Sequence, residues 1–346
     1  MSDPIPSSVS TLAPLAPADI SARKRPLAVL FVFAAGLAWA LLVASPVHAW
    51  AGRVWGAHPD GDGVLFAPGG RQLLIWLGQT DAALPVTART TLLLLLVGAV
   101  LLQLPLGALL ASLAFSRTAP VPAPAILDPD TDLDAKPDGD EPKPRLRSPR
   151  VNTALQVGVA AFLPLCGLLA LGTVAAIVVI GLGAIASSAV DHGLAERMGD
   201  ARAFTLRLVT FALFLAIAAV IGVIVDLARA AVGRETGLTA ARGTSSPAWS
   251  VMLRGVRSAL SVARRGLLRA TLAWAWRAAI GVAMLIAGYY VAQLLGGRGG
   301  SSLTILFLVH QLIVLGRTAM RASWLAHAIA LVAPVQDARE QGMTKE

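Results

Sequence analysis

Charged residues are scarce in this chain. Only 14% of its 346 residues are Asp, Glu, Lys or Arg, whereas 56% are hydrophobic, and the mean hydropathy is +0.69. A soluble globular protein carries roughly a quarter charged residues and a smaller apolar share. The composition therefore excludes an ordinary soluble domain and predicts an integral membrane protein.

Cysteine is nearly absent, and the familiar catalytic motifs are missing. Cys166 is the single cysteine and lies in an apolar run, which excludes an intrachain disulfide framework and a cysteine-rich zinc site. The sequence contains no His-Glu-x-x-His, no Gly-x-Ser-x-Gly and no phosphate-binding loop that ends in Gly-Lys. We therefore expect no catalytic residues, no metal and no cofactor, and we favour a non-enzymatic protein.

What the chain does contain is a series of long apolar runs with helical periodicity. A helix needs roughly 20 apolar residues to cross a hydrocarbon core of about 30 Å. The runs that meet or approach this length are 27–45, 91–115, 157–186, 204–225, 270–295 and 303–332. The predicted fold is an all-α polytopic membrane bundle of about six transmembrane helices, with short interfacial amphipathic helices.

Polar segments between these runs divide the chain. We expect a disordered cytoplasmic leader at 1–26, two spans at 27–115 joined by an outer loop at 46–90, a disordered acidic and proline-rich cytoplasmic linker at 116–150, a four-helix membrane region at 151–334 and a polar tail at 335–346. Within the outer loop, 71–77 predicts a short amphipathic helix at the interface. Gln103 and Pro105 interrupt the second span and predict a kink, because proline lacks a backbone donor.

Positive charge sets the expected orientation in the membrane. Arg23, Lys24 and Arg25 precede the first apolar run, and eight arginines with a single acidic residue lie between Arg229 and Arg269. Cytoplasmic loops of membrane proteins carry such an excess of Lys and Arg. We therefore expect both termini in the cytoplasm. The bias towards Ala, Arg and Gly suggests a high-GC bacterial genome, and hence a bacterial inner membrane.

The first apolar run has a second interpretation. Val47, His48 and Ala49 resemble a signal-peptidase site, so that residues 1–49 would be removed. The run is longer than the ~7–15 apolar residues usual in a signal peptide, which favours an uncleaved anchor. N-terminal sequencing of the membrane-extracted protein separates the two, because cleavage would leave a chain that begins at Trp50.

The linker at 116–150 also has alternative interpretations. Its acidic side chains match positions 1, 3, 5, 9 and 12 of a calcium-binding EF-hand loop at Asp130, Asp132, Asp134, Asp138 and Glu141. Ala135 stands where that loop needs glycine, and no amphipathic helices flank the segment, so a solvated acidic linker is the better interpretation. Contact between this linker and a basic segment at 246–266 is another interpretation, because their charges are opposite.

The basic segment at 246–266 has the pattern of an amphipathic helix. Trp249, Met252, Val256, Ala259 and Leu260 recur at spacings of three and four, and the other side carries Arg254, Arg257, Arg264 and Arg265. One interpretation places this helix in the cytoplasmic interface, with its arginines on anionic headgroups or a partner. The other has its apolar face packed on the bundle and its charges setting topology only. The two can coexist.

A second polar group is expected inside the membrane. It consists of Asp226, Arg229, Gln311, Arg317 and Arg321. At about 1.5 Å per residue, Arg317 and Arg321 lie ~21 Å and ~27 Å from the start of the last run, near the depth at which Asp226 ends the fourth. We expect Asp226 to pair with Arg321 or Arg317, with Arg229 as a local competitor. A structural clamp is favoured over a cavity that receives an anionic headgroup or solute.

These residues also carry a resemblance. Asp226-x-Ala228-Arg229, the basic helix after it, and Gln311 with Arg317 and Arg321 resemble a loose group of uncharacterised bacterial six-helix inner-membrane proteins. They are also similar to the membrane domain that accompanies some glycerophosphodiester phosphodiesterases. The resemblance covers roughly the last 150 residues. It implies a bacterial inner membrane, and it implies no phosphodiesterase activity, because the soluble domain has no counterpart here.

Three functions are compatible with these features. The leading hypothesis is a structural or accessory membrane protein whose basic cytoplasmic face engages anionic phospholipid headgroups or a protein partner, and no nucleic acid. The second is a transporter or permease subunit with a polar site around Gln311, Arg317, Arg321 and Asp226. The third is a lipid-processing membrane enzyme.

Overall fold

Six long apolar helical stretches make up most of the molecule. The structure is a computed structural model that describes residues 12–55, 83–117, 149, 151–244, 246–295 and 301–343. Within these residues, the stretches long and apolar enough to cross a membrane are Pro26–Arg53, Leu84–Ala114, Val151–Val190, Ala201–Ala241, Ala248–Leu295 and Thr304–Arg339. The predicted all-α bundle is confirmed, and the chain is a multi-pass membrane protein.

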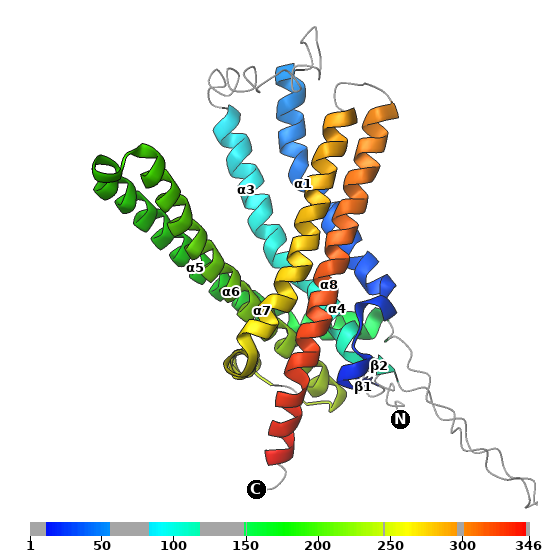
Figure 1. The fold of residues 1–346 in the computed structure, drawn as a ribbon. Helices are drawn as coiled ribbons and strands as arrows, with labels where there is room; N and C mark the ends of the chain where they lie inside the picture. The colour runs from blue at the N-terminus through cyan, green and yellow to red at the C-terminus, as the bar shows by residue number, and fades with distance from the viewer. Residues whose placement is uncertain are drawn as a thin grey trace, which may run out of the picture.

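The helices converge at one end of the molecule and spread apart at the other. They are α1 (Pro26–Trp55), α3 (Ala83–Leu101), α4 (Gln103–Ala114), α5 (Val151–Met198), α6 (Asp200–Ala241), α7 (Ala248–Leu295) and α8 (Ser301–Met343). Figure 1 shows both short strands and the last turns of α8 at the end where the helices meet, which we call the closed end. Towards the opposite, open end, the hairpin of α5 and α6 leans away from α7 and α8 (Figure 1).

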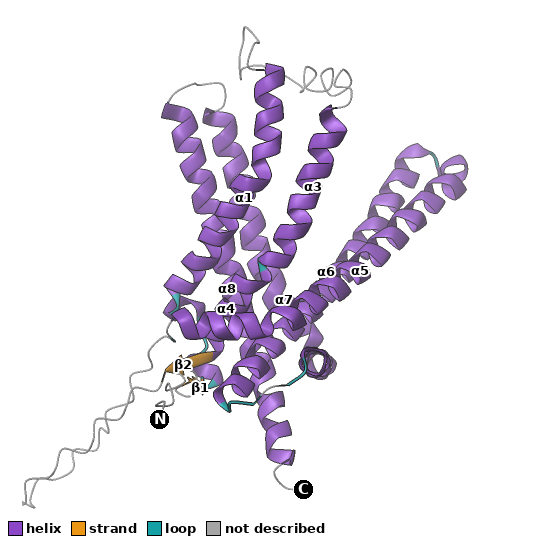
Figure 2. Ribbon diagram, turned by 180° about the vertical axis from the view of Figure 1, so that it is seen from behind, coloured by secondary structure: helices purple, strands orange, loops and turns teal. Residues whose placement is uncertain are grey.

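A small antiparallel sheet lies at the closed end (Figure 2). The elements that lead into and form it are β1 (Leu12–Pro14), the 3-10 turns η2 (Pro17–Asp19) and η3 (Ala22–Lys24), and β2 (Phe115–Arg117). Next to it, the Arg25 guanidinium donates to the carbonyl oxygen of Phe115 at 3.2 Å, and burial lowers the pKa of Arg25. Within the leader predicted to be disordered at 1–26, residues 12–24 form β1, η2 and η3, and strand pairing holds them against β2.

The second span is broken into two helices. α3 ends at Leu101 and α4 begins at Gln103, so the predicted kink is present and falls just before Gln103. Pro105 lies in the first turn of α4, where a backbone N–H would have no partner within the helix. α4 packs on α1, α5, α6 and α8, and nearly all of its residues are buried. It therefore forms the centre of the closed end rather than a lipid-facing half-span.

Tight packing is concentrated around α4. α4 and its neighbours bury large apolar side chains there, among them Leu110, Leu113, Leu165, Leu227, Trp324 and Ile329. Towards the open end, apolar side chains such as Ile177, Leu213 and Leu312 are mostly exposed in the isolated chain. Lipid tails are as apolar as these side chains, so a membrane can cover them without cost.

Small residues allow the closest helix contacts. At Gly107 of α4 and Gly158 of α5 a β-carbon would come within 2.9 Å of the backbone of the opposite helix. Farther along α5, Gly172 faces Val225 and Gly183 faces Phe214, both on α6. The α4–α5 contact is therefore a backbone-to-backbone contact, which only glycine permits.

Four helices extend into segments that we expected to be loops or tails. α1 continues through Pro46 to Trp55, because the carbonyl oxygen of Leu42 that Pro46 leaves free accepts the hydroxyl of Ser45 at 2.8 Å. α5 and α6 are separated by Gly199 alone, at a positive φ of 79°. α8 passes through Pro334 to Met343, so the polar tail expected at 335–346 is helical as far as Met343.

Two predictions lie outside the described residues. They are the interfacial helix at 71–77 and the acidic register from Asp130 to Glu141. The interpretations of the acidic segment, namely a calcium-binding loop, a solvated linker or a contact with the basic segment at 246–266, therefore remain predictions.

Candidate functional site

Asp226 is the centre of a polar cluster at membrane depth. Its side chain is on α6, and the residue is only 4% exposed. One carboxylate oxygen, Oδ1, accepts from the Arg229 guanidinium at 2.8 Å and from that of Arg321 at 3.3 Å. The other oxygen, Oδ2, accepts from the indole nitrogen of Trp324 at 3.1 Å. We call these four residues the Asp226 cluster.

The cluster joins α6 to α8. The predicted pair of Asp226 with Arg321 is confirmed, and Arg229 binds the same oxygen instead of displacing it. The two ion pairs differ in environment, because the Arg229 side chain is 12% exposed and that of Arg321 is 53% exposed. The buried pair with Arg229 and the buried bond from Trp324 therefore hold the carboxylate, and Arg321 is the more adaptable partner.

The other expected members of the cluster lie elsewhere. Arg317 is exposed and forms no hydrogen bond or ion pair with any described residue. Gln311 has a buried side-chain oxygen without a described partner, and it lines neither of the cavities below. We had predicted that Gln311 belongs to the polar group around Asp226, and in the structure it lies apart from that group.

Two cavities flank the Asp226 cluster. One, of about 450 Å³, lies between α7 and α8 and has Arg277, Arg317 and Arg321 in its wall. The other, of about 400 Å³, lies where the α5–α6 hairpin leans away from α7 and α8, and its wall includes Asp226 and Arg229. Trp274 and Arg321 line both cavities and so form a partition between them. We call the first the α7–α8 cavity and the second the hairpin cavity.

Arg277 faces α8 from the opposite side of the α7–α8 cavity. Its guanidinium donates to the carbonyl oxygen of Ala273 at 2.6 Å and to the hydroxyl of Ser323 at 3.2 Å. The side chain therefore reaches α8 through the Ser323 hydroxyl, while the Ala273 carbonyl of α7 itself accepts its second bond.

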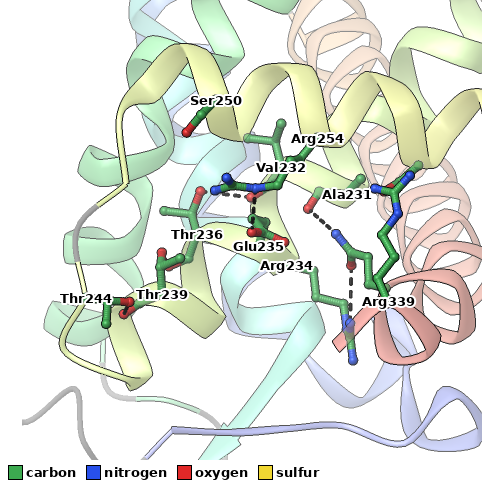
Figure 3. A network of polar contacts seen from close by, with 12 residues as sticks. Ala231, Val232, Arg234, Glu235, Thr236, Thr239, Thr244, Ser250, Arg254 and Arg339 are labelled. Carbon is green, nitrogen blue, oxygen red and sulfur yellow. Dashed lines mark hydrogen bonds and ion pairs between the residues drawn. The ribbon is translucent and has the colours of Figure 1, made fainter. Parts of the chain in front are cut away.

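A second polar network ties α6 to α8 at the closed end (Figure 3). The buried Arg234 guanidinium donates to Asp337 at 2.7 Å and to the side-chain oxygen of Gln336 at 3.2 Å. The amide nitrogen of Gln336 in turn donates to the carbonyl oxygen of Ala231 at 3.0 Å. This arrangement leaves the buried amide of Gln336 satisfied on both sides, as burial of a polar group requires. We call it the Arg234 network.

Two further contacts bind α7 to its neighbours. Arg254 donates to the Glu235 carboxylate on α6 at 3.0 Å, as Figure 3 shows, and Arg339 of α8 donates to the Ser258 hydroxyl at 3.3 Å. Arg254, which we grouped with the membrane-facing arginines, is therefore engaged within the protein. Arg257, Arg264 and Arg265 are exposed and form no such contact with the described residues.

The first segment of α7, residues 248–265, runs across the bundle. Both Figure 1 and Figure 2 show it end-on, and the backbone leaves the helical conformation at Gly266, where the long part of α7 begins. Val251, Met252 and Ala259 are buried against the bundle, whereas Trp249 is 66% and Leu260 43% exposed. The face that we read as a single apolar surface is thus divided between the protein interior and the exterior.

Sequence reasoning missed several of these partners. Trp324 follows Arg321 by three residues and so lies on the same face of α8, a signal that was available. Gln336 and Asp337 lie beyond Pro334, where we ended the helix and expected a tail. Arg234 looked like one more loop arginine, and nothing in its local sequence predicts that a helix 102 residues later covers it.

No family model, curated protein or solved structure matches this chain. Among the described residues, no group of three His, Cys, Asp or Glu side chains could hold a metal ion. The resemblance to six-helix bacterial membrane proteins accordingly stays a prediction.

Proposed function

We propose that this chain is a structural or accessory membrane protein, not an enzyme, whose basic face at the closed end engages anionic lipid. The observation that supports this most is the surface of residues 248–265. This segment offers exposed arginines and exposed apolar side chains side by side, at the end of the bundle.

The arrangement of that surface follows from helix geometry. At about 100° per residue, Trp249, Val256 and Leu260 lie on one arc of the helix. Arg257 and Arg264 lie on the adjacent arc, and the buried residues lie opposite both. A helix at a membrane interface needs such a pair of arcs, one for the acyl boundary and one for the headgroups. Each arginine near an anionic surface contributes about 1 kcal/mol to its attraction.

The orientation is part of the same proposal. The closed end carries β1, the end of α8 and the basic segment of α7. The end of α1 and the starts of α3 and α6, which include Arg53, Arg89 and Arg202, lie towards the other end. An excess of arginine on one side favours the cytoplasm for that side. We therefore propose a bacterial inner membrane with both termini in the cytoplasm, in keeping with the resemblance of the sequence.

Spin-label depth measurements test this function. In a Cys166→Ser background, a nitroxide on Trp249→Cys should collide with oxygen more often than with a water-soluble nickel chelate, because it lies at the acyl boundary. The preference should grow when phosphatidylglycerol replaces phosphatidylcholine, and it should fall when Arg257 and Arg264 are both changed to Gln.

The matched control is a label on Thr244→Cys, an exposed position in the connection that precedes α7. It should favour the nickel chelate in every lipid. If the label at position 249 behaves like the label at 244 regardless of phosphatidylglycerol, the segment does not lie on the membrane. A protein partner would then be the better candidate for this surface.

Transport is the second candidate, because one observation favours it. Arg321 and Trp274 separate two cavities, so a small movement of Arg321 would join the α7–α8 cavity to the hairpin cavity. A transporter needs a group of this kind, which separates the two halves of the passage in one state and lets an anion or a lipid headgroup through in another. Vesicles with the reconstituted protein and a fluorescent phosphatidylglycerol test this by dithionite quenching. Quenching of half the lipid, as in protein-free vesicles, would exclude lipid transfer between leaflets.

A further inference from the structure

We propose that the α7–α8 cavity is a binding site for the phosphate group of an anionic glycerophospholipid. The proposal rests on the proposed function in one respect, namely that the closed end meets an anionic leaflet. It concerns other residues, however, and therefore other variants test it.

Unbalanced positive charge is the first observation. Arg277, Arg317 and Arg321 line the cavity, and its described lining contains no acidic residue. Asp226 lies behind Arg321 and already binds Arg229. Within a membrane span, arginines are costly unless an anion balances them. The cavity therefore lacks one or more negative charges that its own walls do not supply.

Arg317 supplies the donor groups for such an anion. Its guanidinium has no hydrogen-bond acceptor among the described residues, while its aliphatic stem lies beside Gly281, where a β-carbon would be 3.8 Å from Cγ of Arg317. The stem of Arg317 thus packs on Gly281 at the wall of the cavity. A planar guanidinium binds two phosphate oxygens at once, which makes arginine the usual partner of phosphate.

The polarity of the lining changes along the cavity. Near the closed end the wall contains the tryptophans Trp274 and Trp324 and the arginines, and towards the open end it contains Val282, Leu285 and Val314. A free phosphate ion would make no favourable contact with the apolar half of the cavity. A glycerophospholipid has this same order of groups, with its phosphate next to the closed end and an acyl chain along the apolar half.

Depth in the membrane agrees with this order. Arg317 is 16 residues beyond Ser301, where α8 begins, which corresponds to ~24 Å of helix. The hydrocarbon core is about 30 Å thick, so Arg317 lies on the hydrocarbon side of the phosphates in the leaflet at the closed end and close to them. The cavity of about 450 Å³ has the size of a small-molecule site and admits a headgroup with the first part of a chain.

Native mass spectrometry of the full-length protein in non-ionic detergent tests the site. Titration with phosphatidylglycerol should show one lipid bound at least about tenfold more tightly than phosphatidylcholine. Arg317→Gln should weaken that lipid about tenfold, because a charge-assisted hydrogen bond is lost. Its thermal unfolding should be unchanged, since Arg317 has no hydrogen-bonding partner within the described protein.

Two further variants separate this site from the rest of the basic face. Gly281→Leu fills the cavity without changing its charge, and it should also release the tight lipid. Arg257→Gln removes an exposed arginine of α7 that lies outside the cavity, and it should leave the tight lipid in place. Loss of lipid in Arg257→Gln but not in Arg317→Gln would assign the lipid to residues 248–265 and overturn the proposal.

Inorganic phosphate distinguishes the two sources of the anion. At millimolar concentration it should not displace the bound phosphatidylglycerol, because it makes no use of the apolar half of the cavity. Displacement would show a site for free anions. Equal affinity for both phospholipids, which share the phosphate, would show no selectivity for a net negative headgroup. Either result overturns the lipid site, while the depth of a label at position 249 would still report on the proposed function.

Discussion

Asp226 is held by donors that differ in how far water reaches them. Arg229 and Trp324 meet it in the protein interior, and Arg321 meets it from a side chain that is half exposed. Removal of a buried charge leaves its partner uncompensated, whereas an exposed pair is screened by solvent and contributes little. The same carboxylate therefore takes part in one strong contact and one weak contact.

Substitutions at the two ends of this pair should differ in cost. Asp226→Asn should lower the free energy of unfolding by about 2–3 kcal/mol, because the Arg229 guanidinium stays buried without its counter-ion. Arg321→Gln should cost less than about 1 kcal/mol. Reversible unfolding in mixed micelles with a denaturing detergent, followed by tryptophan fluorescence, measures both. Equal costs would mean that the buried pair with Arg229 contributes nothing.

Gln336 should behave as a structural residue in spite of its position near the end of the chain. Gln336→Leu removes an acceptor from Arg234 and a donor from the carbonyl of Ala231, both of them buried, and should cost about 1–3 kcal/mol in the same assay. Arg254→Gln is the matched control, because its pair with Glu235 is 38% exposed on the arginine side. We expect this control to cost under about 1 kcal/mol.

The sequence was informative for residues whose partner lies at a predictable depth. Asp226 and Arg321 lie at the same depth, and this could be predicted because each residue of a helix adds a fixed rise along a predicted span. The partners of Arg234 were not predictable, because they depend on how α8 approaches α6 beyond Pro334. For Gln311 the prediction from spacing failed, because its position on α8 relative to Arg317 does not bring it into the Asp226 cluster.

At the scale of the helices, α4 was the least predictable. As a sequence, residues 103–114 continue an apolar run, and they read as the second half of a lipid-facing span. In the structure they are buried on nearly every side. An apolar run has the same composition whether protein or lipid surrounds it, so composition alone does not distinguish the two.

The α4–α5 contact gives a test at this scale. Gly158→Ala places a methyl group 2.9 Å from the backbone nitrogen of Ala108 and 3.0 Å from the carbonyl oxygen of Leu104, and neither atom can move independently of α4. It should cost about 1–3 kcal/mol, as overpacking does.

Gly181→Ala is the control for this substitution. A β-carbon at Gly181 has nothing within 4 Å, and alanine is a better helix former than glycine. The variant should be as stable as the natural chain or more so by about 0.5–1 kcal/mol. If both substitutions left the free energy of unfolding unchanged, the close contact between α4 and α5 would contribute nothing to stability.

On the scale of the whole molecule, the lengths of the apolar runs predict the number of spans, and the distribution of charge predicts their direction. It did not give the shape, because the angle between the hairpin of α5 and α6 and the rest of the bundle depends on contacts at the closed end. The ends of the chain that the structure describes are consistent with an even number of crossings.

Thiol labelling tests the direction. In a Cys166→Ser background, a membrane-impermeant maleimide should modify Ser301→Cys in intact cells, since the start of α8 lies at the open end. It should modify Gly342→Cys only after the membrane is permeabilised. Modification of Gly342→Cys in intact cells would place the closed end outside and reverse the proposed orientation.

The lean of the α5–α6 hairpin has a consequence for its contact with a bilayer. At the open end the hairpin stands apart from α7 and α8 (Figure 1), and exposed side chains on it, such as Ile177 and Leu213, are apolar. In a bilayer, lateral pressure in that leaflet would act on these side chains, while the packing around α4 holds the base of the hairpin. Because the hairpin cavity lies at this base, we expect its width to depend on how tightly the surrounding lipids are packed.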